Sequence, residues 1–300
     1  MIRVFLIIFL IALIIYFIHA ILSPPNIRKA KQSIIRARGE FLILILSLSI
    51  AVFILLFLSR LTFGIVLIGI PITLVMIKAR QSQLMGQAIR VGVNQFSEIN
   101  KSVENVAARL SMQQPDVYVV QSPEINAYAM GVFGKKTVVL HSKTIECMNP
   151  KELMSILGHE FSHILCGHTK WISLTNSSRF INIPIVSMVF EMIFLFWSRK
   201  AEYTADRGGL IACADLHAST SALIKLSVGE ELFKQFDINE LLAQKAELDS
   251  DWFATLSENI STHPYIVKRI FALKAFCGTE SYADIIRFIN RKESRKDCTD

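Results

Sequence analysis

The chain has 300 residues, enough for a membrane anchor and one domain of about 200 residues. It is 52% apolar, and its mean hydropathy of +0.43 is high for a protein that is soluble throughout. The net charge is +7, but no basic face interleaved with aromatic residues is visible, so a nucleic-acid partner is not expected. Five scattered cysteines form no CxxC pair, which argues against a zinc knuckle or a disulfide framework.

Residues 1–80 are predicted to form a membrane anchor. Residues 4–22 are one apolar run with the length of a transmembrane helix. A signal peptide is the alternative, disfavoured because the run is long and no small-x-small cleavage site follows it. A basic loop at 28–38 precedes a second apolar region at 41–77, which is interrupted near Arg60. We expect that region to form a hairpin of two short helices, rather than one crossing and an interfacial helix.

Basic residues beside the apolar segments indicate an orientation. A hairpin over 41–77 returns the chain to the side it left, so the basic loop at 28–38 lies on the same side as Lys78, Arg80 and Arg90. The positive-inside rule places that side, and everything after it, in the cytoplasm. The expected location is a bacterial inner membrane, with the part of the chain after residue 80 in the cytoplasm.

Residues 81–290 are predicted to form an α+β domain, mostly helical with a small β-sheet, followed by a polar tail at 291–300. Apolar residues at helical spacing indicate a helix over 98–111. Short strands are expected at 117–120, 127–133 and 137–141.

A further helix is expected to begin after Asn149 and to run to about Cys166. Asn149 suits the N-cap, Pro150 suits the first helical position, and Glu152 stands three residues after the cap.

The pattern HExxH at 159–163 falls in the middle of this helix. On a helix, His159 and His163 project from one face and can hold one zinc ion. Glu160 lies about 100° around the helix, where it can accept a proton from a water on the metal as that water attacks a carbonyl. The pattern therefore predicts a zinc hydrolase with Glu160 as the general base. The alternative is a pair of ordinary helix histidines.

A hydrolytic zinc site needs a third protein ligand and an open fourth position. Glu202 and Asp206 are four residues apart and share a helical face. We assign Glu202 to the metal and Asp206 to a hydrogen bond with the outer nitrogen of a ligating histidine. The alternative is a solvated acidic face paired with Lys200 and Arg207. His168 is expected to be structural, because a continuous helix would rotate it about 140° away from His163.

Four blocks of sequence make the chain resemble the HtpX-like membrane zinc metallopeptidases, which are relatives of the CAAX-prenyl endopeptidases and the BepA-type proteases. The resemblance covers about residues 95–275, and its blocks are 126–131, 158–163, 202–207 and 262–264 with 269–270. It implies a zincin-type domain in which His159, His163 and Glu202 hold one zinc ion per chain, with Glu160 as the base and Asp206 as the partner of a ligating histidine.

The resemblance also implies roles for two further parts of the sequence. His263 matches a histidine–proline motif and is expected to stabilise the oxyanion of the reaction. Its alternative role is to cap the next helix, and Arg269 is expected to be a structural ion-pair partner. An edge strand is expected to pair with an extended substrate through backbone hydrogen bonds. Its residues are Asn126, Ala127, Tyr128, Ala129, Met130 and Gly131.

The family usually has two membrane helices between the last histidine of HExxH and the glutamate ligand, but here there is one apolar stretch, 181–197. A single crossing would separate Glu202 from His163, and two crossings need about 40 residues plus a turn. Only 38 residues lie between the two side chains. We therefore predict that 181–197 does not span, and is re-entrant, interfacial or a core helix over the site.

These features together predict a membrane-anchored zinc endopeptidase that cleaves unfolded or membrane-associated polypeptides, with a role in protein quality control. Its expected partners are polypeptide substrates and the lipid bilayer, and oligomer formation is left open. The alternative is a catalytically silent membrane scaffold or chaperone on the same fold. A channel or transporter is disfavoured because the N-terminal apolar segments carry no charge within the membrane apart from Arg60.

Overall fold

The computed structural model describes residues 35–61, 69–131, 134–178, 184–259, 261 and 263–297. The chain divides into two units, Met1–Ile34 and Ile35–Asp300, and the description below concerns the second. The helix predicted at 4–22 and most of the basic loop lie outside the described residues.

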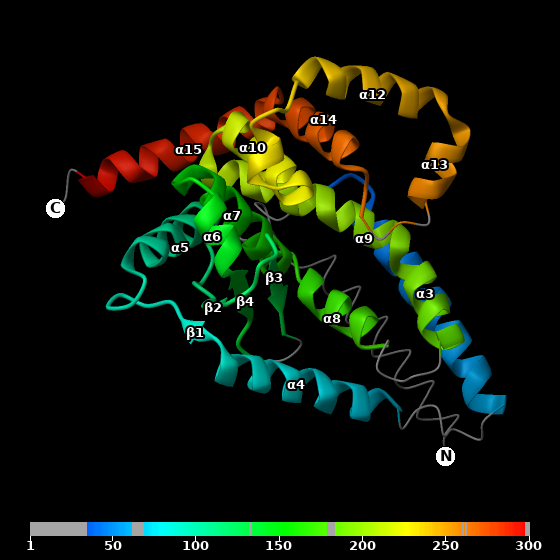
Figure 1. The fold of residues 1–300 in the computed structure, drawn as a ribbon. Coiled ribbons are helices and arrows are strands. Elements are labelled where there is room, and N and C mark those ends of the chain that lie inside the picture. Colours follow the sequence, from blue (N-terminus) through cyan, green and yellow to red (C-terminus); the bar gives the residue numbers. More distant parts are fainter. Residues whose placement is uncertain are drawn as a thin grey trace. The chain divides into compact units, whose positions relative to one another are not determined.

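The second unit is mostly helical with one small mixed sheet, as predicted (Figure 1). The described helices are α3 (Glu40–Leu61), α4 (Gly69–Gln87), α5 (Ser97–Leu110), α6 (Ser142–Cys147), α7 (Pro150–Leu165), α8 (His168–Ser178), α9 (Pro184–Cys213), α10 (Leu216–Val228), α11 (Glu230–Phe233), α12 (Ile238–Ser250), α13 (Trp252–Asn259), α14 (Ile266–Cys277) and α15 (Glu280–Asp297). The described strands are β1 (Ile89–Arg90), β2 (Asp116–Val120), β3 (Ala127–Met130) and β4 (Thr137–His141).

The sheet has the strand order β1-β2-β4-β3. Strand β4 is central, and its residues Val138, Val139 and Leu140 are fully buried. It pairs with β2 in parallel and with β3 antiparallel. Strand β3 is therefore at an edge, and among the described residues its outer side has no strand partner. The predicted strand at 127–133 ends at Met130, and residues 132–133 lie outside the described part.

Helix α7 begins as its sequence predicts. The Asn149 side chain accepts a hydrogen bond of 3.0 Å from the Glu152 amide, and the Glu152 carboxylate accepts one of 2.9 Å from the Asn149 amide. This capping box fixes the start of the helix. The helix ends at Leu165, and Gly167 then adopts a φ of +77°, a left-handed conformation that suits glycine.

Helices α7 and α9 pack against each other through glycines. A Cβ atom added to Gly158 of α7 would lie 2.4 Å from the Ala212 Cβ and 2.9 Å from the Gly208 carbonyl oxygen of α9. A Cβ atom added to Gly208 would lie 1.6 Å from the Ser162 Oγ. This contact brings together the HExxH helix and the helix that carries Glu202, and it leaves no room for a side chain.

We expect Gly158→Ala to lower the free energy of unfolding by about 1–3 kcal/mol, because the two helices must move apart to accept the methyl group. Chemical denaturation of the purified protein measures the change. Gly86→Ala in α4 is the matched control, since an added Cβ there meets nothing within 4 Å, and it is expected to be neutral or slightly stabilising. Equal destabilisation by both variants would contradict the packing argument.

Helix α9 is continuous from Pro184 to Cys213, so most of the apolar stretch at 181–197 shares a helix with Glu202. Leu195 and Trp197 are buried and line the cleft described below. Met192 and Phe196 on the same helix are about half exposed. The choice among the three placements considered for this stretch therefore stays a prediction.

In the described part of the chain, one helix is long and apolar enough to cross a membrane, the Glu40–Arg60 portion of α3. It buries Leu44 and Ala51 against α9 and leaves Leu42 and Phe53 about 70% exposed. Helix α4, which overlaps the second half of the expected hairpin, does not meet the same criterion. The number of N-terminal crossings therefore stays a prediction.

Candidate metal centre

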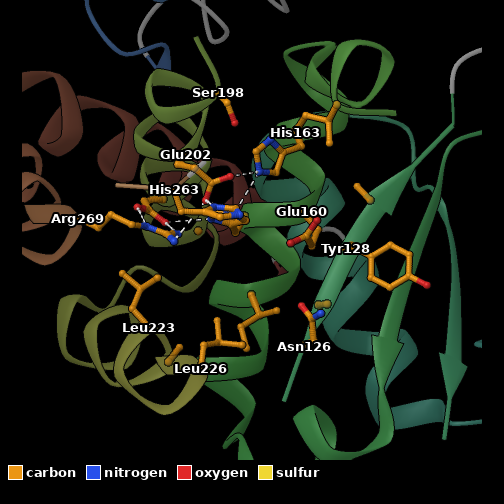
Figure 2. A pocket seen from close by; sticks show the side chains of 18 of the residues that line it. Asn126, Tyr128, Glu160, His163, Ser198, Glu202, Leu223, Leu226, His263 and Arg269 are labelled. Atoms are coloured by element: carbon orange, nitrogen blue, oxygen red, sulfur yellow. Dashed lines mark hydrogen bonds and ion pairs between the residues drawn. The ribbon is translucent and has the colours of Figure 1, made fainter. Parts of the chain in front are cut away.

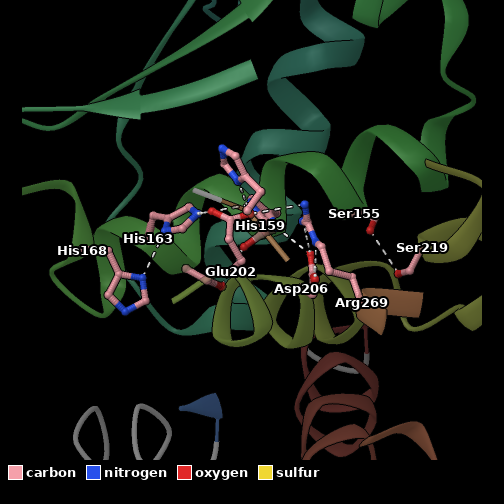
Figure 3. A network of polar contacts seen from close by, with 11 residues as sticks. Ser155, His159, His163, His168, Glu202, Asp206, Ser219 and Arg269 are labelled. Carbon is pink, nitrogen blue, oxygen red and sulfur yellow. Dashed lines mark hydrogen bonds and ion pairs between the residues drawn. The ribbon is translucent and has the colours of Figure 1, made fainter. Parts of the chain in front are cut away.

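Three side chains from α7 and α9 converge on one point. The Nε2 atoms of His159 and His163 are 3.1 Å apart. The carboxylate oxygens of Glu202 lie 3.7 Å from the His159 Nε2 and 3.5 Å from the His163 Nε2 (Figure 3). Side chains four residues apart on α7 supply two donors, and the close approach of α9 brings the third.

These donors fit a zinc ion. Two imidazole nitrogens and one carboxylate oxygen are ligands that zinc prefers in catalytic sites. Bonds of about 2.0–2.1 Å in tetrahedral geometry place neighbouring ligand atoms about 3.3 Å apart. The three observed separations, 3.1, 3.5 and 3.7 Å, surround that value. His163 and Glu202 are buried, so the donors are held in place by the protein around them.

The outer nitrogen of His159 is held by Asp206. The His159 Nδ1 lies 3.0 Å from an Asp206 carboxylate oxygen, so its N–H donates and the Nε2 lone pair faces the site. Arg269 donates two hydrogen bonds, of 2.9 and 2.6 Å, to Asp206, and its Nη1 lies 3.3 Å from Glu202. Burial opposes ionisation of Asp206, but the charge of Arg269 outweighs it and lowers the pKa of the carboxyl.

The outer nitrogen of His163 is held by a residue that the sequence analysis assigned to a structural role. The Nδ1 atoms of His163 and His168 are 3.0 Å apart, and the His168 Nε2 lies 3.0 Å from the Glu40 Oε1. Burial lowers the pKa of His168 to about 4, so the ring is neutral at pH 7. The expected rotation of His168 away from the site is wrong because α7 ends before it. The left-handed Gly167 redirects the chain, and His168 opens α8.

Glu160 projects toward β3 rather than toward the three donors. Figure 2 shows its carboxylate between His163 and the segment that carries Asn126 and, on β3, Tyr128. The residue is 7% exposed, and burial raises the pKa of its carboxyl. The two histidines and the backbone amide of Ala129 act in the opposite direction on that pKa. A carboxylate in this position can exchange a proton with a molecule held beside the donors.

A cleft of about 670 Å³ opens in front of these groups. One wall is the segment 125–129, which contains the first residues of β3, and His159, His163 and Glu202 of the metal centre also line the cleft. Leu223 and Leu226 of α10 supply apolar lining (Figure 2). Of the six residues predicted to bind substrate, Asn126, Ala127, Tyr128 and Ala129 line this cleft, whereas Met130 and Gly131 do not.

His263 also lines the cleft. Its Nδ1 lies 3.4 Å from a Glu202 oxygen, and 64% of its side chain is exposed. The alternative role of capping the next helix is not observed, because α14 has Tyr265 at its N-cap and no side-chain capping bond.

A family model described as peptidase family M48 matches residues 94–276, which is more than half of the chain. The chain belongs to peptidase family M48. The HtpX-like resemblance drawn from the four sequence blocks is therefore confirmed. The matched range contains the three metal donors, Glu160, His263 and Arg269, but not Glu40.

Curated relatives are similar to this M48 peptidase over most of its length. It is 28% identical to the plastoglobule-localized metallopeptidase 48, chloroplastic, of Arabidopsis thaliana over 70% of this chain and 65% of that protein. It is 25% identical to a protease HtpX homolog of Syntrophotalea carbinolica, over 57% and 74% of the two chains. A protease HtpX homolog of Streptococcus uberis is 27% identical over 63% and 77%. The match thus spans slightly less than two thirds of the Arabidopsis protein.

Proposed function

We propose that the chain is a membrane-anchored zinc endopeptidase that hydrolyses peptide bonds of unfolded or membrane-associated polypeptides. The observation that carries the proposal is the convergence of His159, His163 and Glu202 beside a carboxylate, Glu160, that takes no part in the cluster. A purely structural zinc site is closed by four protein ligands, whereas a hydrolytic one has three and an adjacent base.

His159, His163 and Glu202 would hold the ion. Zinc would supply Lewis acidity, which polarises a substrate carbonyl and makes a water molecule easier to deprotonate. Glu160 accepts the proton of the attacking water and passes it to the leaving amine. His263, on the open side of the cleft, donates a hydrogen bond to the oxygen that becomes negative during attack.

The edge of β3 is the proposed binding surface for the polypeptide. Its outer backbone groups can pair with an extended substrate, which gives affinity without strict demands on the substrate's sequence. The Ala129 amide already interacts with Glu160, so a substrate paired along β3 lies next to the base. The residues proposed to contact substrate are Asn126, Ala127, Tyr128, Ala129, Met130 and Gly131.

Membrane anchoring is supported by α3, whose exposed apolar side chains suit lipid. The names of the HtpX relatives support protease activity. The basic residues beside the apolar segments favour an inner membrane with the catalytic domain on the cytoplasmic side.

The alternative of a silent scaffold is disfavoured by the chemistry of the site. Burial of the Glu160 carboxylate costs free energy. A scaffold would gain nothing from a buried glutamate next to three converged metal donors.

Zinc content and casein cleavage of the purified protein in detergent test the proposal. We expect about one zinc ion per chain, activity that is lost on chelation and restored by zinc, and loss of both in Glu202→Ala. Glu240→Ala, on the exposed surface of α12, is the control and should match the wild type. A wild-type protein that binds no zinc, or that cleaves casein in the presence of chelator, would overturn the proposal.

A further inference from the structure

The start of α3 lies against the metal centre. Glu40, its first residue, is 1% exposed, and its carboxylate accepts hydrogen bonds from Arg36 and from Thr204 of α9. Further contacts fix the approach to the helix. The Ala37 amide donates to the Thr204 Oγ1 at 2.7 Å, and Arg36 donates to the Cys166 carbonyl oxygen at the end of α7 at 2.6 Å.

Glu40 connects to the metal centre through two imidazole rings. The chain of contacts runs from Glu40 Oε1 to His168 Nε2, and from His168 Nδ1 to His163 Nδ1, with 3.0 Å at each step. His168 is 1% exposed and also packs edge-on against the Trp197 ring of α9 at 5.7 Å between centroids. Both imidazole rings are buried, with His163 on α7 and His168 on α8.

The contacts along this chain match an arrangement of protons that suits metal binding by His163. An ionised Glu40 has no proton to give, so His168 donates from its Nε2. The His163 and His168 Nδ1 atoms are 3.0 Å apart, so one of them donates to the other, and His163 is the donor when its Nε2 faces a metal ion. The remaining nitrogen of His163, its Nε2, is left with a free lone pair directed at His159 and Glu202. A carboxylate two rings away thus sets the tautomer that a metal ligand needs.

We propose that Glu40 is a positioning residue of the metal centre, acting through His168 to hold His163 in its metal-binding tautomer and orientation. This inference rests on the proposed function, because it assumes that the centre binds zinc. It makes the first turn of the candidate membrane helix a part of the site. His159 and His163 are then supported by carboxylates on different helices, Asp206 on α9 and Glu40 on α3.

The test is zinc affinity, measured in detergent by competition with a chromogenic chelator, for the full chain and for Glu40→Ala and His168→Phe. The phenylalanine keeps the ring next to Trp197 and removes both nitrogens. Loss of a group that supports a metal ligand typically weakens binding about 10–100-fold, and we expect that range for each variant. The double variant should lose no more zinc affinity than the single variant that binds zinc more weakly, because the two groups act in series.

Glu152→Ala is the matched control. Glu152 is also a buried carboxylate, on α7 itself. It forms an ion pair with Lys225, with 2.9 Å between the Lys225 Nζ and the Glu152 Oε2, and does not contact the metal donors. The Glu152→Ala variant should have a lower melting temperature, with a zinc affinity within about threefold of the wild type. If Glu40→Ala fails to fold, His168→Phe alone decides the question.

Wild-type zinc affinity in a folded Glu40→Ala or His168→Phe variant would overturn the inference, as would additive losses in the double variant. These outcomes leave the proposed function intact, because the wild type still binds zinc. A wild type without zinc would instead remove the proposed function, and this inference with it.

Discussion

Replacing Glu160 with glutamine is expected to lower kcat for casein cleavage by about 10²–10⁴-fold and to leave zinc content unchanged. Glutamine keeps the size and the hydrogen-bonding oxygen of the side chain but cannot accept a proton. Glu160 is not among the three converged donors, so its replacement removes no metal ligand. Steady-state assays and zinc analysis on the same preparation measure the two quantities.

The comparison between activity and zinc content separates the candidate functions. Glu146→Gln, at the exposed surface of α6, is the control and should behave as the wild type. Full activity in Glu160→Gln would mean that another group acts as the base. Loss of zinc together with activity would mean that Glu160 supports the metal centre, and the assignment of general base would fail.

Replacing Arg269 with methionine is expected to lower the free energy of unfolding of the metal-free protein by about 3–5 kcal/mol. Arg269 donates to Asp206 and lies 3.3 Å from Glu202, and both carboxylates are buried. Methionine fills much of the same space but carries no charge. The variant therefore leaves two buried carboxylates without their cation. The free energy lost in this way exceeds the stability that the intact ion pairs contribute.

Denaturant titration of the zinc-free protein measures this effect. Arg287→Met is the control, because its ion pair with Asp284 is exposed on α15, and such pairs contribute at most about 1 kcal/mol. A change in Arg269→Met no larger than in the control would show that the two carboxylates do not need the arginine.

The parts of the structure that sequence predicted best are those set by local chemistry. The start of α7 was predicted to the residue because a capping box needs only Asn149, Pro150 and Glu152. The strand Thr137–His141 was predicted with its observed bounds from a short apolar run. Glu202 and Asp206 were assigned from a spacing of four, and the structure places them beside the two histidines.

The parts that sequence missed depend on geometry beyond one element. His168 was assigned by continuing the helical rotation past Cys166. Gly167, which adopts a left-handed conformation, invalidates that rotation. The Gly167-His168 pair after the helix was the available signal, because glycine commonly ends a helix. Glu40 had no such signal. It lies 128 positions before His168, and only the tertiary fold brings the two together.

The edge position of β3 has a consequence for how such an enzyme would choose its targets. Four residues of open strand can pair only with a segment that has left its own secondary structure. Cleavage of a folded protein then follows the fraction of time that a segment is released. Each 1.4 kcal/mol of local stability in the target reduces that fraction about tenfold. A protease of this design would distinguish damaged from intact proteins by their thermodynamics, with little need to read their sequences.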